Sequence, residues 1–345
     1  MRFAVPLSSL LMLSVTASGI EPRAVLGDRT EMVATAVPLD PSDSGRTRLG
    51  ALTYLGGLRL TSRDPAFGGF SSMRVAGDRF TLLSDGGNLV EFSMGADFRP
   101  RAVRFADLPG PGTGAIKRHR DSESLTWDPQ TGRAWVGFEN RNAIWRYDEG
   151  LTRAERSVRP AAMADWSIAG GPEAMVRLRS GRFLVISETA RPQGRPDARI
   201  LLRFAGDPTE SKSPPERLAY VPPVEYDPTD MAELPDGRLL VLNRRLSLAG
   251  LFTAKLVLVD MRGARAGAVV RGTELATFER PVQHDNFEAL AITREGTDTI
   301  VWIASDDNGE IWEQSLLLKF RLDFGQPKSP PPQRERADAK PQKAR

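Results

Sequence analysis

The sequence predicts an all-β fold: a β-propeller of five or, as an alternative, six four-stranded blades around a central channel. Two observations carry this prediction. The 345 residues include 31 Gly, 26 Pro and many short apolar runs, a combination that favours strands and turns over long helices. A pattern of two short strands joined by a polar turn recurs at intervals of 52, 50, 56 and 59 residues, as expected when each repeat forms one blade.

Each repeat has a small or acidic residue, an apolar strand, a polar turn with Gly or Asp, and a second apolar strand. Examples are "DSESLTWDPQTGRAWVGFEN", which begins at Asp121, and "GGPEAMVRLRSGRFLVISE", which begins at Gly170. Aligning the turns brings one apolar position of each repeat into a common column: Met73, Leu125, Met175, Met231 and Leu290. Five repeats are recognised in this way, and each sheet must pack on its neighbours to bury both faces.

The remaining strands follow from the same pattern. The segments "AIWRYD", "ARILLRF", "AKLVLVD" and "LLLKFRL" are expected to be third strands. Residues 52–60, "LTYLGGLRL", precede the first repeat and are placed to close the ring by completing the last blade. Residues 247–280 leave room for a sixth, degenerate blade, although five blades are preferred.

The chain divides into four predicted parts: a signal peptide at 1–19, a flexible segment at 20–48, the propeller at 49–325 and a disordered tail at 326–345. The first 19 residues have one Arg, an apolar run from Phe3 to Val15 and then small residues, as in a secretory signal. A membrane anchor or a buried strand is the alternative, but the run is short for a bilayer. We therefore expect export to the periplasm or beyond, with no transmembrane span.

Composition excludes several kinds of site. The chain has no Cys, which excludes disulfides, thiol catalysis and zinc–thiolate centres. The formal net charge is +3, but the Pro-rich tail alone holds six Lys/Arg and two Asp/Glu, so the rest of the chain is close to neutral. Nucleic acid is therefore not an expected partner, and a monomer that binds a small anionic ester is expected.

Acidic residues recur at both ends of the repeated hairpin. The first strand of a propeller blade lines the channel and the second returns to the same face, so two rings of side chains are expected at one mouth. The inner ring comprises Ser71, Glu123, Glu173, Thr229 and Glu288. The outer ring comprises Asp85, Glu139, Glu188, Arg244 and Asp306.

So many carboxylates repel one another unless a cation neutralises them. Calcium, which takes six to eight oxygen ligands, is one solution, and Glu123, Glu173 and Glu288 would carry it. Pairing with basic side chains is the other. The candidates for pairing, and for binding an anionic substrate, are Arg244, Arg245, Arg141, Lys117 and Arg118.

The chain has two histidines, and each precedes an inner-ring glutamate by four residues: His119 before Glu123, and His284 before Glu288. A histidine near neutrality can act as a general acid or base, or bind phosphate, whereas the simpler alternative is a loop histidine bonded to a carboxylate. No G-x-S-x-G, H-E-x-x-H or P-loop motif is present. A divalent cation beside basic groups suggests a phosphate ester as substrate.

The segments "FGGFSSMRVAGDRFTLLSDGG", "DSESLTWD", "GGPEAMVRLRSGRFLVISE" and "DNFEALAI" resemble the phytase-like family, which is described as having esterase-like activity. The resemblance covers residues 52–324 and implies an exported bacterial propeller related in architecture to calcium-dependent phytases. A weaker similarity to five-bladed calcium-activated nucleotidases implies that Ser71 and Thr229 join the three inner glutamates as the metal shell. Thr229 and Arg244 depart from rings made only of acids.

The expected function is calcium-dependent hydrolysis of a phosphate or related ester at the acidic mouth. Asp85, Glu139, Glu188 and Asp306 would hold or activate water, while His119, His284 and Arg244 would contact the substrate. One alternative is a non-catalytic propeller that binds a ligand or protein at the same face. Another is a lactonase-like enzyme acting on a neutral ester, which would not need Arg244.

Overall fold

The computed structural model describes residues 21–28, 30–247 and 252–323, and these form an all-β protein, as predicted. Within the described ranges the helical elements are two single 3-10 turns, η1 (Lys117–His119) and η2 (Ala161–Met163). The described residues contain no helix with the length and hydropathy needed to cross a membrane. The predicted signal peptide and the predicted tail lie outside the described residues.

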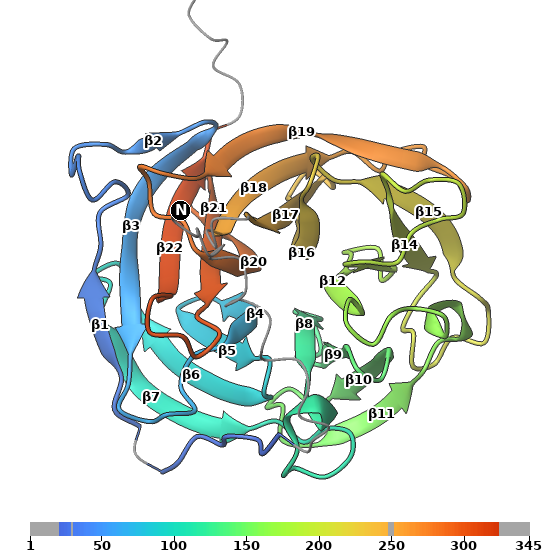
Figure 1. The fold of residues 1–345 in the computed structure, drawn as a ribbon, viewed down its shortest axis with the longest axis horizontal. Helices are drawn as coiled ribbons and strands as arrows, with labels where there is room; N and C mark the ends of the chain where they lie inside the picture. The colour runs from blue at the N-terminus through green and yellow to red at the C-terminus, as the bar shows by residue number, and fades with distance from the viewer. Residues whose placement is uncertain (1–20, 29, 248–251, 324–345) are drawn as a thin grey trace, which may run out of the picture.

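The strands form four sheets around a common axis (Figure 1). Two sheets have four antiparallel strands in chain order. The first contains β4 (Phe70–Ala76), β5 (Arg79–Ser84), β6 (Asn88–Met94) and β7 (Pro100–Asp107). The second contains β8 (Ser122–Trp127), β9 (Ala134–Phe138), β10 (Ala143–Tyr147) and β11 (Ala154–Val158).

The third sheet has eight strands, because two antiparallel groups of four are joined where β15 and β19 pair in parallel. One group contains β12 (Pro172–Arg177), β13 (Phe183–Ser187), β14 (Arg199–Phe204) and β15 (Glu216–Val221). The other contains β16 (Asp227–Glu233), β17 (Leu239–Leu246), β18 (Phe252–Val259) and β19 (Val269–Phe278). Within residues 247–280, where the sequence left room for a sixth blade, residues 252–259 and 269–278 form β18 and β19 of this group.

The fourth sheet joins the two ends of the described chain. It contains β20 (Asn286–Glu295), β21 (Asp298–Asp306), β22 (Ser315–Leu322), β3 (Leu52–Thr61) and β1 (Val33–Ala36), with β2 (Arg48–Leu49) also paired to β3. The antiparallel pairing of β22 with β3 confirms the predicted closure by residues 52–60. The four segments predicted as third strands are β10, β14, β18 and β22, and each pairs with the second strand of its group.

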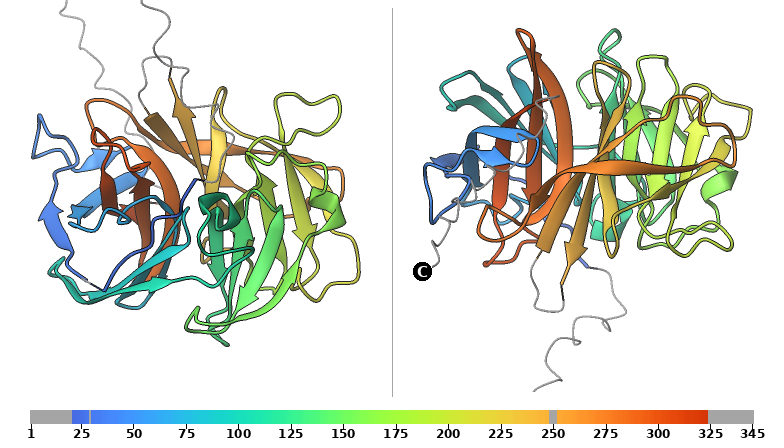
Figure 2. Two further views of the ribbon diagram at one scale, coloured as in Figure 1. Left: turned by 60° about the horizontal axis from the view of Figure 1, so that its bottom comes forward. Right: turned by 90° about the horizontal axis from the view of Figure 1, so that it is seen from above.

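Five inner strands, β4, β8, β12, β16 and β20, surround the axis, and each contacts the next so that the ring closes (Figures 1 and 2). Apolar layers between neighbouring groups hold the ring together. The turn after each inner strand carries a glycine with positive φ, a conformation that other residues adopt at a cost. These glycines are Gly77, Gly132, Gly181, Gly237 and Gly296.

Residues 20–48 were expected to be flexible, but their described part packs on the ring. β1 pairs with β3, and Leu39 is 1% exposed. Arg23 is buried: its guanidinium donates to the carbonyls of Gly86 and Gly87 and pairs with Asp107. The segment is ordered because its side chains satisfy buried polar groups of the first sheet, which its loop-like composition did not reveal.

Closure by β3 predicts where the fold is sensitive to mutation. Leu318 lies on β22 opposite Gly57 of β3 and is fully buried. Leu318→Ala should lower the free energy of unfolding by about 2–5 kcal/mol, because it leaves a cavity in the closing sheet. Leu55→Ala on β3 is the matched control, since Leu55 is 40% exposed and should change stability little. Urea denaturation measures both, and equal effects would contradict the prediction.

Candidate functional site

Each inner strand carries a β-bulge at the same place in the repeat. The ladder skips one residue between Phe70 and Ser72, and the other four inner strands show the same shift. A bulge leaves its extra residue unpaired and redirects the side chain. The five bulged residues are those of the predicted inner ring, and all are at least nine-tenths buried: Ser71, Glu123, Glu173, Thr229 and Glu288.

The two hydroxyl residues of the ring tie neighbouring inner strands together. The Oγ of Ser71 donates to the carbonyl of Ser122 on β8 at 2.6 Å. The Oγ1 of Thr229 donates to the carbonyl of Phe287 on β20 at 3.2 Å. Each hydroxyl therefore has a structural partner where the repeat lacks a glutamate.

The glutamates lie in a compact group of acids. Two triples have carboxylate oxygens within 4.8 Å of one another: Asp121, Glu123 and Glu139, and Glu139, Glu173 and Glu188. Glu139 belongs to both, so inner-ring and outer-ring acids meet as predicted and form one continuous cluster. We call Asp121, Glu123, Glu139, Glu173 and Glu188 the carboxylate cluster.

Asp121 was not among the predicted site residues. It directly precedes β8, and its carboxylate accepts a hydrogen bond from the side chain of Asn140. The signal in the sequence was the spacing of "DSE", since residues two apart on a strand share a face. In the other repeats, the position two residues before the inner-ring residue is occupied by Gly69, Gly171, Asp227 and Asn286. Only one of these is an acid, so the repeat did not mark this position as part of the site.

Burial and mutual repulsion disfavour the ionised form of the carboxylate cluster. Burial, and then repulsion from Glu173, raise the pKa of Glu123 well above its usual value. Burial, and then repulsion from Asp121, raise the pKa of Glu139 to about 7. The donor set is made of oxygen alone and is densely charged, which fits a hard divalent cation such as calcium.

These pKa values predict how stability depends on pH. Glu139 has a pKa of about 7 in the folded protein against 4.5 ordinarily, so the folded state binds more protons between these limits. Without metal, stability should therefore fall as pH rises from 4.5 to 7. A divalent cation held by these carboxylates would bind their deprotonated form, so the stabilisation expected from calcium should grow over the same range. Melting curves in EDTA and in calcium at several pH values test this, and a metal-free protein more stable at pH 7 than at pH 5 would contradict it.

Arg244 closes one side of the cluster. Its Nη2 lies 2.8 Å from Glu188 Oε1 and its Nη1 lies 3.0 Å from Glu288 Oε1. The Nη1 also donates to Asn286 Oδ1 at 2.8 Å. Glu288 thus differs from the other two inner glutamates, because an arginine neutralises it. Burial nevertheless raises the pKa of Glu288 to about 7.

The two remaining acids of the outer ring lie beside Glu288. Asp85 pairs with Lys117 Nζ at 2.8 Å. Asp306 is 4% exposed and accepts a hydrogen bond from the amide of Asn308 at 2.6 Å. Burial, and then repulsion from Glu288 and Asp85, raise the pKa of Asp306 well above its usual value. All ten residues of the two predicted rings therefore lie at one mouth.

Other predicted residues lie apart from the carboxylate cluster. His119 is hydrogen-bonded to Thr113, and the Nδ1 of His284 lies 3.0 Å from the carbonyl of Phe252. Burial lowers the pKa of His284, so it favours the neutral form. The loops that carry the histidines turn them toward local partners.

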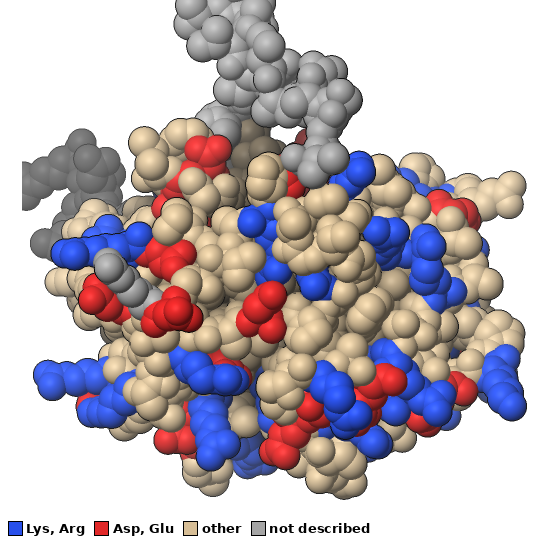
Figure 3. All heavy atoms as spheres, turned by 90° about the horizontal axis from the view of Figure 1, so that it is seen from below, with Lys and Arg blue, Asp and Glu red and all other residues tan. Residues whose placement is uncertain are grey.

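Arg245 also points elsewhere. Arg245 pairs with Glu225 at 3.1 Å and stacks on Tyr226, on the opposite face of β17 from Arg244, because successive side chains of a strand alternate. For Arg141 the structure gives a backbone contact: its carbonyl accepts a hydrogen bond from Arg159. On the side of the ring seen in Figure 3, basic and acidic residues are intermixed.

Comparisons with known proteins place the fold in context. No curated protein matches the sequence. Similar solved structures include the hydrazine synthase of Kuenenia stuttgartiensis, the α-L-arabinofuranosidase PaAbf62A of Podospora anserina in complex with cellotriose, and the Cps50 (Swd1) β-propeller domain of Myceliophteria thermophila. Their identities are 10%, 15% and 12%, and their TM-scores are 0.34, 0.44 and 0.35. The matches cover 70%, 84% and 75% of this chain, and 57%, 97% and 88% of theirs.

The family comparison is more informative. Residues 65–309 match the phytase-like family, described as "Esterase-like activity of phytase". The matched region runs from before β4 to beyond β21 and contains all five bulged residues and the whole carboxylate cluster. Since it spans well over half of the sequence, the chain belongs to the phytase-like family of β-propellers.

Proposed function

We propose that this protein is a calcium-dependent hydrolase of phosphate or related esters, acting at the acidic mouth. The observation that carries the proposal is the carboxylate cluster itself: two buried and three partly buried acids whose shared member, Glu139, joins two sets of ligand atoms, with Arg244 alongside. Buried carboxylates this close are costly without a cation. The family description, esterase-like activity, agrees with a hydrolytic reaction.

The residues at the mouth would have different roles according to their neighbours. Asp121, Glu123, Glu139 and Glu173 would hold calcium, since their carboxylate oxygens lie within the two close triples and none of them pairs with Arg244. Calcium, when bound, polarises a phosphoryl oxygen and lowers the pKa of a coordinated water. Thr229 and Ser71 keep the inner strands in register at the same level.

The substrate would approach from the side of Arg244. The side chains of Arg244 and Lys117 are 22% and 38% exposed, so both can reach an anionic group at the mouth. Glu188 lies between Glu173 and Arg244, and its side chain is 17% exposed. It is the cluster member best placed to accept the proton from an attacking water at its Oε atoms. Asp85 and Asp306 would orient that water through their position beside Glu288.

We further propose that the four sheets represent five four-stranded blades. The parallel pairing of β15 with β19 supports division of the eight-stranded sheet into two blades, and the addition of β1 and β2 to β3 accounts for the six-stranded one. Export to the periplasm or beyond also remains part of the proposal. Sequencing the N-terminus of protein recovered from intact cells would test it, since cleavage near residue 19 is expected.

A panel of phosphomonoesters, phosphodiesters and a neutral lactone, assayed in calcium and in EDTA, tests the function. We expect turnover of at least one phosphate ester in calcium, loss of that turnover in EDTA, and loss of it in Glu188→Gln. Turnover of the lactone alone would favour the lactonase-like alternative. Calcium-dependent stability without turnover of any ester would support the non-catalytic alternative and overturn the proposal.

A further inference from the structure

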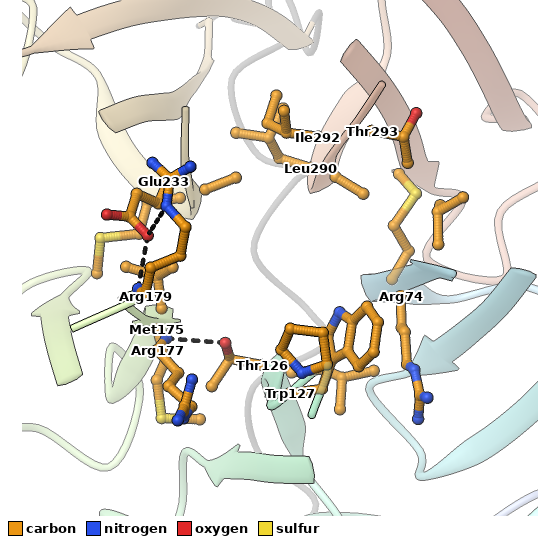
Figure 4. A pocket seen from close by; sticks show the side chains of 18 of the residues that line it. Arg74, Thr126, Trp127, Met175, Arg177, Arg179, Glu233, Leu290, Ile292 and Thr293 are labelled. Atoms are coloured by element: carbon orange, nitrogen blue, oxygen red, sulfur yellow. Dashed lines mark hydrogen bonds and ion pairs between the residues drawn. The ribbon is translucent and has the colours of Figure 1, made fainter. Parts of the chain in front are cut away.

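The channel opens into a second pocket at the end opposite the acidic mouth, with a volume of about 420 Å³ (Figure 4). The pocket lies at the C-terminal ends of the inner strands, whereas the carboxylate cluster lies at their N-terminal ends. One buried apolar side chain from each inner strand lines it, and these are the residues that define the repeat: Met73, Leu125, Met175, Met231 and Leu290.

The charge of this pocket is opposite to that of the mouth. Its lining includes four arginines, Arg74, Arg177, Arg179 and Arg294, against one glutamate, Glu233. Figure 4 shows that Arg179 and Glu233 lie on one side of the opening and Arg74 on another, with Leu290 and Ile292 between them.

Two of the arginines are already neutralised. Arg179 Nε lies 3.4 Å from Glu233 Oε2, and Arg177 Nη2 lies 3.3 Å from Asp128 Oδ2. Among the described residues, neither Arg74 nor Arg294 forms a salt bridge. Arg74 instead stacks on the ring of Trp127, with its guanidinium carbon 4.2 Å from the ring centroid, and it donates to the carbonyl of Glu149 at 3.3 Å.

We propose that this pocket binds a small aromatic oxoanion, such as an aryl carboxylate or sulfonate. The ring of the ligand would lie on the apolar floor, where methionine thioethers adapt to flat partners and make favourable sulfur–aromatic contacts. Trp127 would form one wall of the pocket. The anionic group of the ligand would meet Arg74 and Arg294 at the rim. The volume lies within the range of small-molecule sites. The site is separate from the proposed hydrolytic centre.

Calorimetric titration of the full chain with naphthalene-2-sulfonate, in EDTA, tests the site without involving calcium at the mouth. Saturable binding with one site per chain is expected. The same titration with 2-naphthylmethylammonium should show no saturation, because the ring is retained and the charge reversed. Equal binding of the two probes, or no saturation by the sulfonate up to millimolar concentrations, would overturn the proposal.

Substitutions at the rim of the pocket test whether the sulfonate binds there. Arg74→Gln combined with Arg294→Gln should weaken sulfonate binding by about tenfold or more, since both unpaired charges are lost. Arg271→Gln is the matched control: Arg271 is on β19, does not line the pocket, is 62% exposed, and its substitution should leave binding unchanged. If the double variant does not fold, Arg294→Gln alone serves, because Arg294 is exposed. Wild-type affinity in the rim variant, or an equal loss in the control, would contradict the assignment.

Discussion

Glu139→Gln should abolish the proposed response of activity and stability to calcium. Glu139 belongs to both sets of candidate ligand atoms, so its loss weakens both at once. The value of kcat/KM for the best phosphate ester should fall by about 100-fold or more, as expected when a metal ligand is removed. The rise in melting temperature produced by calcium should also disappear, because binding to the folded state is the source of that stabilisation.

The same substitution should stabilise the metal-free protein above pH 7. Glutamine removes one buried negative charge, and its side-chain oxygen can still accept the hydrogen bond from the amide of Gly170. Calorimetry in EDTA at pH 8 should therefore show a higher melting temperature for Glu139→Gln than for the wild type. Glu225→Gln is the control, since Glu225 is 71% exposed and pairs only at the surface. A variant that keeps the full calcium response would contradict the metal centre.

Arg244→Ala should be among the most destabilising single substitutions in the chain. It leaves Glu188 and Glu288 without their shared cation while both remain largely buried. Breaking a buried ion pair in this way costs about 3–5 kcal/mol. The loss should be greatest above pH 7 and smaller near pH 5, because burial raises the pKa of both carboxyl groups and protonation removes the unpaired charge.

The neighbouring arginine provides a matched control. Arg245→Ala removes an exposed pair with Glu225 and should cost about 1 kcal/mol or less. Urea denaturation at pH 5 and pH 8 measures both variants, and similar losses for Arg244→Ala and Arg245→Ala would contradict the buried role of Arg244. Arg244→Lys keeps the charge but not the two-pronged contact, so its stability should lie between wild type and Arg244→Ala.

Substitution of Arg244 also distinguishes hydrolysis of a phosphate ester from hydrolysis of a neutral ester. If the substrate is a phosphate ester, Arg244→Lys should impair its turnover more than that of any neutral ester, because a planar guanidinium matches two phosphoryl oxygens. Equal loss for charged and neutral substrates would indicate that Arg244 acts only through the stability of the mouth.

Much of the fold could be predicted from the sequence because the signals are local. Short apolar runs identified the strands, and a polar turn with Gly or Asp followed each first strand. The closing strand at 52–60 followed from its position before the first repeat. The packing of residues 21–48 could not be predicted, because it depends on Arg23 reaching carbonyls more than sixty positions away.

The site was predictable to the extent that it follows the repeat. The repeat brought Glu123, Glu173 and Glu288 to one mouth, yet only the structure shows that Arg244 pairs with Glu288, which lies outside the two triples of close carboxylates. It was also the structure that brought in Asp121 and turned His119, His284 and Arg245 toward other partners.

The sequence by itself determined the class of fold, the order of the strands and the face on which the acids gather, since period-two alternation and turn residues act over a few positions. The tertiary structure alone decided which acids lie close together, which are neutralised and which end of the channel is lined by arginines. The physical reason is that a one-residue bulge redirects each inner side chain, and that Coulomb energies depend on distances between strands far apart in the chain.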